Sequence, residues 1–102
     1  MRATAKGWEW AASNREKAVD FLIKEFPNLN RADEIEAADV MLKYAFNENT
    51  RANGWGAMDP GIWREQIDLY AGLGQFSKRV PKVEEVMTLD ILNATAAGRP
   101  KI

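Results

Sequence analysis

Apolar residues recur every three or four positions along most of this 102-residue chain, and no segment shows the alternating polarity of a strand. In one clear case, apolar side chains occupy positions i, i+3, i+4 and i+7: Val19, Leu22, Ile23 and Phe26. This spacing places them on one face of a helix. The pattern therefore predicts an all-α fold of about five helices.

Capping residues set the expected helix boundaries. Asn30 and Asp59 are the expected N-caps of the third and fourth helices, because a side-chain oxygen at that position accepts from free backbone N–H groups. Ser13 followed by Glu16 matches the capping box and predicts the start of the second helix. We expect helices over residues 2–12, 14–26, 30–46, 59–72 and 82–94, the last one interrupted near Thr88.

Residues 47–58 are expected to form a loop, since they are polar and contain two glycines. At its centre lies Gly54-Trp55-Gly56, which lacks the Lys-Ser/Thr ending of a phosphate-binding loop. The structural interpretation is a tight turn in which the glycines adopt positive φ and the indole fills an apolar gap. The functional interpretation is a tryptophan presented to a flat ligand or to a partner. The sequence predicts one helical domain over residues 1–96 and a flexible tail over residues 97–102.

The chain contains no histidine and no cysteine, which removes the commonest general base, the commonest metal ligand and every thiolate site. Serines therefore lack the usual base for nucleophilic catalysis. The acidic run in the third helix is expected to be a solvated face favoured by the helix dipole: Asp33, Glu34, Glu36 and Asp39. We predict a protein that is not an enzyme, with no cofactor, no catalytic residue and no metal site.

Charge and hydropathy exclude other classes of function. The formal net charge is −1, and the densest basic cluster, Lys78, Arg79 and Lys82, is expected to be ordinary solvated surface rather than a nucleic-acid site. No apolar run approaches the length of a membrane span. The first residues lack the apolar core of a signal peptide, so the chain alone is expected to be cytoplasmic.

Four segments, in order, resemble those of bacterial ABC-transporter substrate-binding proteins of the NMT1/THI5-like group. Residues 6–19 (KGWEWAASNREKAV) are similar to the group's GWxWAxxNPEEAV stretch, and residues 54–63 (GWGAMDPGIW) to its GxGxMDPxxW segment. Residues 67–76 resemble a helix that ends in GLI or GLF. Residues 83–88 (VEEVMT) resemble the start of VDEVFTNEFL, although Met87 stands where phenylalanine is usual.

The resemblance implies the closing helices of a type II periplasmic-binding-protein-like fold, without its sheets. Members of the group bind small solutes, among them nitrate, sulfonates, taurine and a thiamine pyrimidine precursor, and deliver them to a membrane permease in the periplasm. The chain corresponds to roughly the last third of such a protein, so it is expected to be unable to bind solute alone. Trp55 and Trp63 are its candidate ligand-binding residues.

Helices separated from their lobes would leave apolar faces exposed, and exposed faces mark partner surfaces. The side chains concerned are Trp10, Phe21, Met41, Trp63 and Val86. We therefore expect a homo-oligomer, most simply a two-fold dimer. The alternative function is a small helical adaptor that binds another protein through a tryptophan-rich face.

Overall fold

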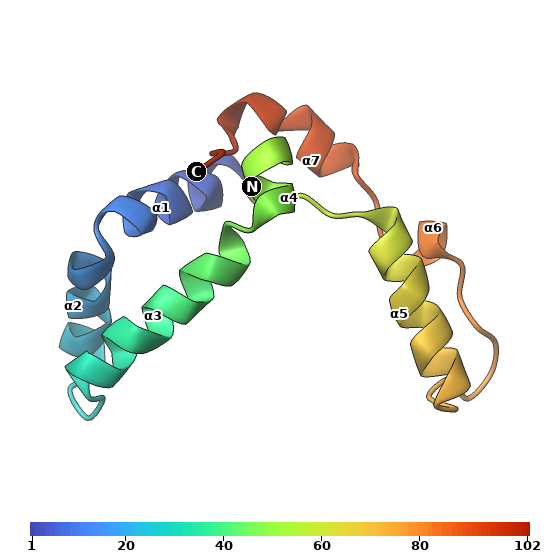
Figure 1. Ribbon diagram of the computed structural model, residues 1–102, viewed down its shortest axis with the longest axis horizontal. Helices are drawn as coiled ribbons and strands as arrows, with labels where there is room; N and C mark the ends of the chain where they lie inside the picture. The colour runs from blue at the N-terminus through green and yellow to red at the C-terminus, as the bar shows by residue number, and fades with distance from the viewer. The chain divides into compact units, whose positions relative to one another are not determined.

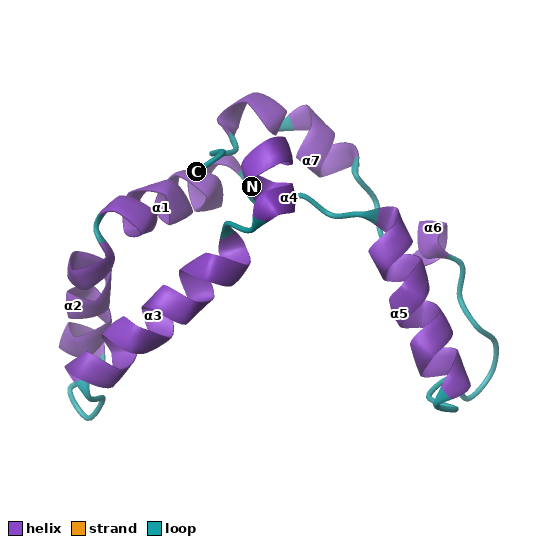
Figure 2. Ribbon diagram, in the orientation of Figure 1, coloured by secondary structure: helices purple, strands orange, loops and turns teal.

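The computed structural model describes all 102 residues, and they form helices joined by loops (Figure 1). Figure 2 shows no strand, which confirms the all-α prediction. None of the helices is long and apolar enough to cross a membrane. There are seven α-helices and one 3-10 turn: α1 Arg2–Ser13, α2 Arg15–Glu25, α3 Arg31–Ala45, α4 Glu48–Asn53, α5 Pro60–Gly72, α6 Val83–Val86, α7 Asp90–Ala94 and η1 Ala96–Gly98.

The helices group into two compact units, residues 1–57 with 95–102 and residues 58–94. In the first unit α2 packs against both α1 and α3, and η1 lies against α1. In the second unit α5 packs against α6. Each unit buries few apolar side chains: Ala5, Val19 and Phe46 in the first, and Ile67, Val83 and Leu92 in the second.

The junction between α1 and α2 corrects the predicted capping box at Ser13 and Glu16. Ser13 is the last residue of α1, so it cannot adopt the extended geometry of an N-cap, and no side chain caps α2. Asn14 is the single residue between the helices. Its side-chain amide donates to the Trp10 carbonyl at 3.0 Å and so satisfies the end of α1 instead.

The start of α3 confirms the predicted cap at Asn30. Its side-chain oxygen accepts from the backbone N–H of Ala32 at 2.9 Å and of Asp33 at 3.3 Å. Despite its 15 residues, α3 buries none of them fully. One face lies half-buried toward α2, whereas Val40, Met41 and Tyr44 are exposed.

The predicted loop over residues 47–58 is wrong for its first half, which forms α4. Asn47 caps this helix by accepting from the Thr50 N–H at 3.1 Å, and the buried Thr50 hydroxyl donates back to the Asn47 carbonyl at 3.2 Å. The helix is short and polar, so it carries no apolar periodicity that could have indicated it.

Both ends of α5 follow local sequence chemistry. Asp59 accepts from the Gly61 N–H at 2.7 Å, and Pro60 occupies the first helical position, where a missing N–H costs nothing. At the other end Gly74 adopts φ 67°, and its N–H donates to the Ala71 carbonyl while the next N–H donates to that of Tyr70. This pair of bonds is the Schellman motif, which glycine favours because it has no Cβ.

The helix predicted over residues 82–94 is interrupted near Thr88, as expected. α6 ends at Val86, α7 begins at Asp90, and the Thr88 hydroxyl accepts from the Asp90 N–H at 3.2 Å. This break and the additional α4 account for seven helices where about five were predicted.

Candidate functional site: an apolar groove in the first unit

The main concave feature of the first unit is an open groove of about 410 Å³ bounded by α1, α2 and α3. Its volume falls in the range of small-ligand sites, roughly 300–1,000 Å³. The lining is predominantly apolar and includes Trp8, Ala11, Val19, Leu22, Ala38 and Met41. The groove therefore offers an apolar surface that another group can cover.

Two charged side chains, Arg15 and Glu34, lie in the wall of the groove. Arg15 is held by an ion pair. One of its guanidinium nitrogens, Nη1, pairs with an Asp39 carboxylate oxygen at 2.5 Å. The Arg15 and Asp39 side chains are 40% and 41% exposed. The Arg15 Nε is buried without a hydrogen-bond partner. Because the pair is partly solvated, it contributes at most about 1 kcal/mol and chiefly orients the guanidinium.

The residues of the groove share a spacing that sequence reasoning did not use. α1 contributes Thr4, Gly7, Trp8 and Ala11, and α2 contributes Arg15, Ala18, Val19 and Leu22. Both sets follow i, i+3, i+4 and i+7, which is the spacing of one helical face. Gly7, Ala11 and Ala18 in these sets are small and only weakly apolar, so a search for large apolar residues does not identify these faces. The signal was present, but only packing shows that the faces enclose one groove.

Trp55 lies in the turn between Gly54 (φ 90°) and Gly56 (φ 79°), as the positive-φ interpretation predicts. Its indole stacks on that of Trp8, with ring centroids 6.1 Å apart and an interplanar angle of 29°. Its backbone N–H donates to the Pro100 carbonyl at 2.8 Å. The structural interpretation of this tryptophan is therefore supported, and its connection to the groove runs through Trp8.

The C-terminal residues have specific partners in the same unit. Arg99 Nη1 donates to the carbonyls of Gly54 at 3.2 Å and Trp55 at 3.0 Å, and Arg51 Nε donates to the Ile102 carbonyl at 3.2 Å. These bonds hold residues 99–102 against the turn that carries Trp55. The sequence missed this contact because nothing local pairs a tail with a turn about 45 residues earlier.

Trp63, the second candidate ligand-binding residue, lies in α5 of the second unit and is 37% exposed. It does not belong to the groove. A smaller cleft of about 200 Å³ in its unit is lined by residues of mixed charge, among them Arg64, Asp68, Lys82 and Glu84. Trp63 does not line that cleft either. The structure thus places the two predicted residues in different units.

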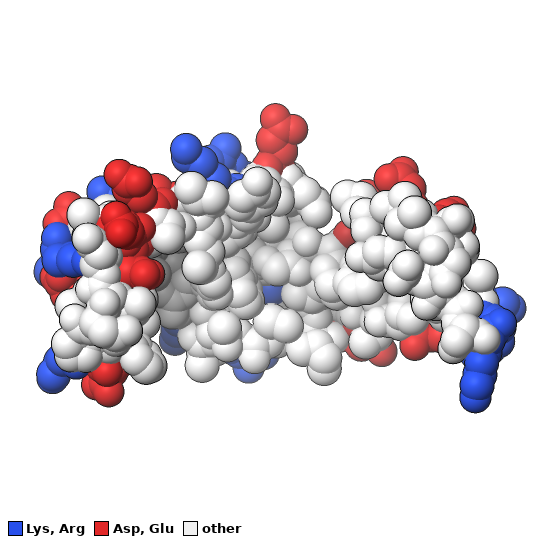
Figure 3. All heavy atoms as spheres, turned by 90° about the horizontal axis from the view of Figure 1, so that it is seen from below, with Lys and Arg blue, Asp and Glu red and all other residues white.

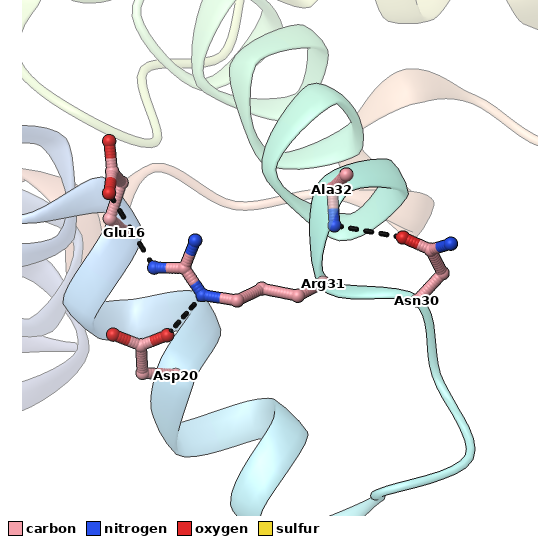
Figure 4. A network of polar contacts seen from close by, with 5 residues as sticks. All are labelled: Glu16, Asp20, Asn30, Arg31 and Ala32. Atoms are coloured by element: carbon pink, nitrogen blue, oxygen red, sulfur yellow. Dashed lines mark hydrogen bonds and ion pairs between the residues drawn. The ribbon is translucent and has the colours of Figure 1, made fainter.

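An ion-pair network joins the start of α3 to α2 (Figure 4). Arg31 Nε donates to an Asp20 carboxylate oxygen at 2.6 Å, and its Nη2 lies 3.5 Å from Glu16 Oε2. The hydrogen bond from Arg31 lowers the pKa of Asp20 and raises that of the guanidinium. All three groups are exposed, so the network orients the α2–α3 turn more than it stabilises it.

In the second unit Arg79 forms a two-pronged pair with Glu85, at 2.7 and 2.6 Å. The same carboxylate accepts from the Lys82 N–H at 2.8 Å at the start of α6. The hydrogen bond from Arg79, followed by that from Lys82, lowers the pKa of Glu85 to about 2. The pair attaches the connection after α5 to α6.

Exposure of the predicted partner-facing side chains is confirmed. Trp10, Phe21, Met41, Trp63 and Val86 are between 37% and 64% exposed. Figure 3 shows charged side chains gathered where the α2–α3 end of the first unit lies. The helices thus present large apolar groups to solvent that the small cores leave uncovered.

No group of three or more acidic, histidine or cysteine side chains is arranged to hold a metal ion. The groove offers apolar contact together with the charged side chains of Arg15 and Glu34. Comparison of the chain with models of known families, with curated proteins and with solved structures gave no match.

Proposed function

We propose that this chain is the closing helical part of a solute-binding protein of the NMT1/THI5-like group, and that its groove packs against the rest of that protein. The observation that carries the proposal is the open apolar groove bounded by α1, α2 and α3. The order of the four similar sequence segments supports it. The chain supplies packing surface in this proposal and has no catalytic role.

The proposal accounts for α3, which packs mainly against α2 and leaves large apolar side chains uncovered. All three of Ala38, Met41 and Leu42 line the groove; Ala38 and Leu42 are half-buried, whereas Met41 is 56% exposed. Covering a large apolar side chain contributes about 1.5–3 kcal/mol, so an uncovered helix gains substantially from a partner. In the full-length protein that partner would be a lobe of the same solute-binding protein. The complete protein would deliver a small solute to a permease in the periplasm.

Trp63 is the better of the two candidate ligand contacts in this proposal. Trp55 is held by Trp8 and by its backbone bond to Pro100, which leaves its indole committed to packing. Trp63 has no ring partner within the chain and retains 37% exposure. A planar solute or a second lobe could therefore stack on it.

The experiment is reconstitution in two pieces. A solute-binding protein of this group is produced without its matching helices, this chain is added, and complex formation and solute affinity are measured by calorimetry. We expect a one-to-one complex and recovery of solute binding. Absence of a complex with several such proteins would contradict the proposal.

A matched pair of variants tests the role of the groove. Met41→Glu places a charge in the groove and is expected to weaken the complex at least tenfold. Val40→Glu is the control, because Val40 is similarly exposed (53% against 56%) but does not line the groove. Equal effects of both variants would count against the groove as the contact.

The second candidate is a helical adaptor, favoured by one observation: Trp10 and Phe21 form an exposed aromatic pair with centroids 6.0 Å apart. Exposed Trp beside Phe is typical of the anchors of protein interfaces. An adaptor would bind a purified partner protein through this pair, and Trp10→Ala would abolish that binding. The same change would leave two-piece reconstitution intact, which separates the two functions.

A further inference from the structure

The outer surface of α1 and α2 combines the exposed aromatic pair with lysines. Lys6 precedes Trp10 by four residues, and Lys17 and Lys24 flank Phe21 at four and three residues. Residues three or four apart on a helix are neighbours, so these ammonium groups surround the two rings. We call this set the basic aromatic face: Lys6, Trp10, Lys17, Phe21 and Lys24.

All five side chains of this face are exposed, and none of its lysines takes part in the ion pairs of the chain. Three acidic residues lie at comparable spacing on these helices: Glu9 three positions from Lys6, Asp20 between Lys17 and Lys24, and Glu25 four positions from Phe21. Asp20 is already paired with Arg31. The face therefore carries three lysines without an ion-pair partner around an apolar centre. Its complement is a surface with acidic groups beside apolar side chains.

The outer surface of α3 is such a surface. Asp33, Glu36, Val40 and Tyr44 follow i, i+3, i+7 and i+11, and all four are exposed, Tyr44 by 78%. Neither carboxylate takes part in an ion pair of the chain. We call this set the acidic face. None of its members lines the groove, so it is distinct from the surface assigned above.

We propose that the basic aromatic face of one copy of this chain binds the acidic face of a second copy. Both faces belong to the first unit. In the contact the lysines of one face would meet the carboxylates of the other, and apolar side chains would meet apolar side chains. In a two-fold arrangement each subunit contributes one face to each of two equivalent contacts. The inference does not depend on the solute-binding proposal, because the groove is not used.

The area involved indicates a weak dimer. The exposed parts of Trp10, Phe21, Val40 and Tyr44 amount to about 400 Å² per copy, on the basis of roughly 200 Å² per aromatic side chain. Stable interfaces bury about 800 Å² per partner. Self-association is therefore expected at roughly micromolar to submillimolar concentrations, with charge pairing selecting the register.

The test is charge reversal measured by sedimentation velocity over a wide range of protein concentration. Lys17→Glu/Lys24→Glu and Asp33→Lys/Glu36→Lys each place like charges in contact, and each is expected to weaken self-association about tenfold or more. An equimolar mixture of the two variants is expected to form a mixed dimer with at least the affinity of the parent chain, because all contacts in it are attractive. Circular dichroism checks that both variants remain helical.

A matched control separates the proposed contact from attraction between net charges. Lys78→Glu/Lys101→Glu and Glu65→Lys/Glu84→Lys make the same changes in net charge outside both faces. Neither is expected to change self-association as strongly, and their mixture is expected to gain nothing over the parent.

Three results would overturn the inference. They are a parent chain that is monomeric at the highest concentration, a dimer that survives both reversals, and a mixture that fails to restore association. Trp10→Ala provides a variant without charge change and should weaken the dimer while leaving two-piece reconstitution unaffected.

Discussion

The indole of Trp8 stacks on the indole of Trp55, with ring centroids 6.1 Å apart and planes inclined by 29°. Trp8 also lines the groove, so the turn that carries Trp55 supports one wall of it. Three hydrogen bonds hold the same turn: the Arg99 guanidinium donates to two of its backbone carbonyls, and its Trp55 N–H donates to the Pro100 carbonyl. A contact between α1, the turn after α4 and the C-terminal residues thus underlies the candidate site.

Trp55→Ala is expected to lower the free energy of unfolding by about 1–3 kcal/mol. The change removes a half-buried ring and its stacking on Trp8, and aromatic pairs contribute about 0.5–1.5 kcal/mol beyond the area they bury. Urea unfolding followed by circular dichroism measures the loss. Tyr44→Ala is the control, since Tyr44 is 78% exposed and should change stability little. A loss as large for Tyr44 would show that the stack is not the cause.

Gly54→Ala is expected to destabilise the first unit by about 1–3 kcal/mol. The residue has φ 90°, and an added Cβ would lie 3.1 Å from Arg99 Cβ and 3.3 Å from the Arg99 carbonyl oxygen. Gly7→Ala is the matched control: Gly7 lies inside α1, and a Cβ there meets nothing within 4 Å. That change should stabilise by about 0.5–1 kcal/mol, and thermal unfolding should therefore shift in opposite directions.

Asn30 and Ser13 were both predicted to cap a helix, but only Asn30 forms the capping hydrogen bonds. Asn30→Ala removes the acceptor for two N–H groups of α3 and is expected to cost about 1 kcal/mol. Ser13→Ala is expected to stay within about 0.5 kcal/mol, because Ser13 caps no helix. Chemical denaturation of the two variants side by side decides the matter. A larger loss at Ser13 would restore the capping box that the structure replaces.

The Glu85 carboxyl is expected to titrate near pH 2, well below its ordinary value of 4.5. A lowered pKa means that the folded state favours the ionised form. The resulting stabilisation is therefore present above pH 4.5 and is lost as the pH falls toward about 2. Arg79→Ala should raise this pKa only part of the way to 4.5, since the Lys82 N–H still donates to the carboxylate. NMR titration of the Glu85 side chain measures both values, and an unchanged pKa in the variant would exclude Arg79 as the main cause.

The sequence predicted helix starts correctly where a capping residue or a proline acts on backbone groups next to it in the chain. Asn30, Asp59 and Pro60 mark helix starts through bonds or constraints within three residues, and the structure confirms them. Ser13 failed because it already belongs to α1. α4 was missed because five of its six residues are polar, so it shows no apolar periodicity.

The sequence by itself determined that the chain is helical, where most helices begin, and that its glycine turn needs positive φ, since these follow from contacts over a few residues. It also indicated that large apolar side chains such as Trp10 and Phe21 would remain exposed. Only the tertiary structure decided that α1, α2 and α3 enclose one groove, that Trp8 meets Trp55, and that Arg99 bonds to the turn after α4. Those contacts join residues separated by tens of positions, and their free energy depends on shape in three dimensions, which no local spacing encodes.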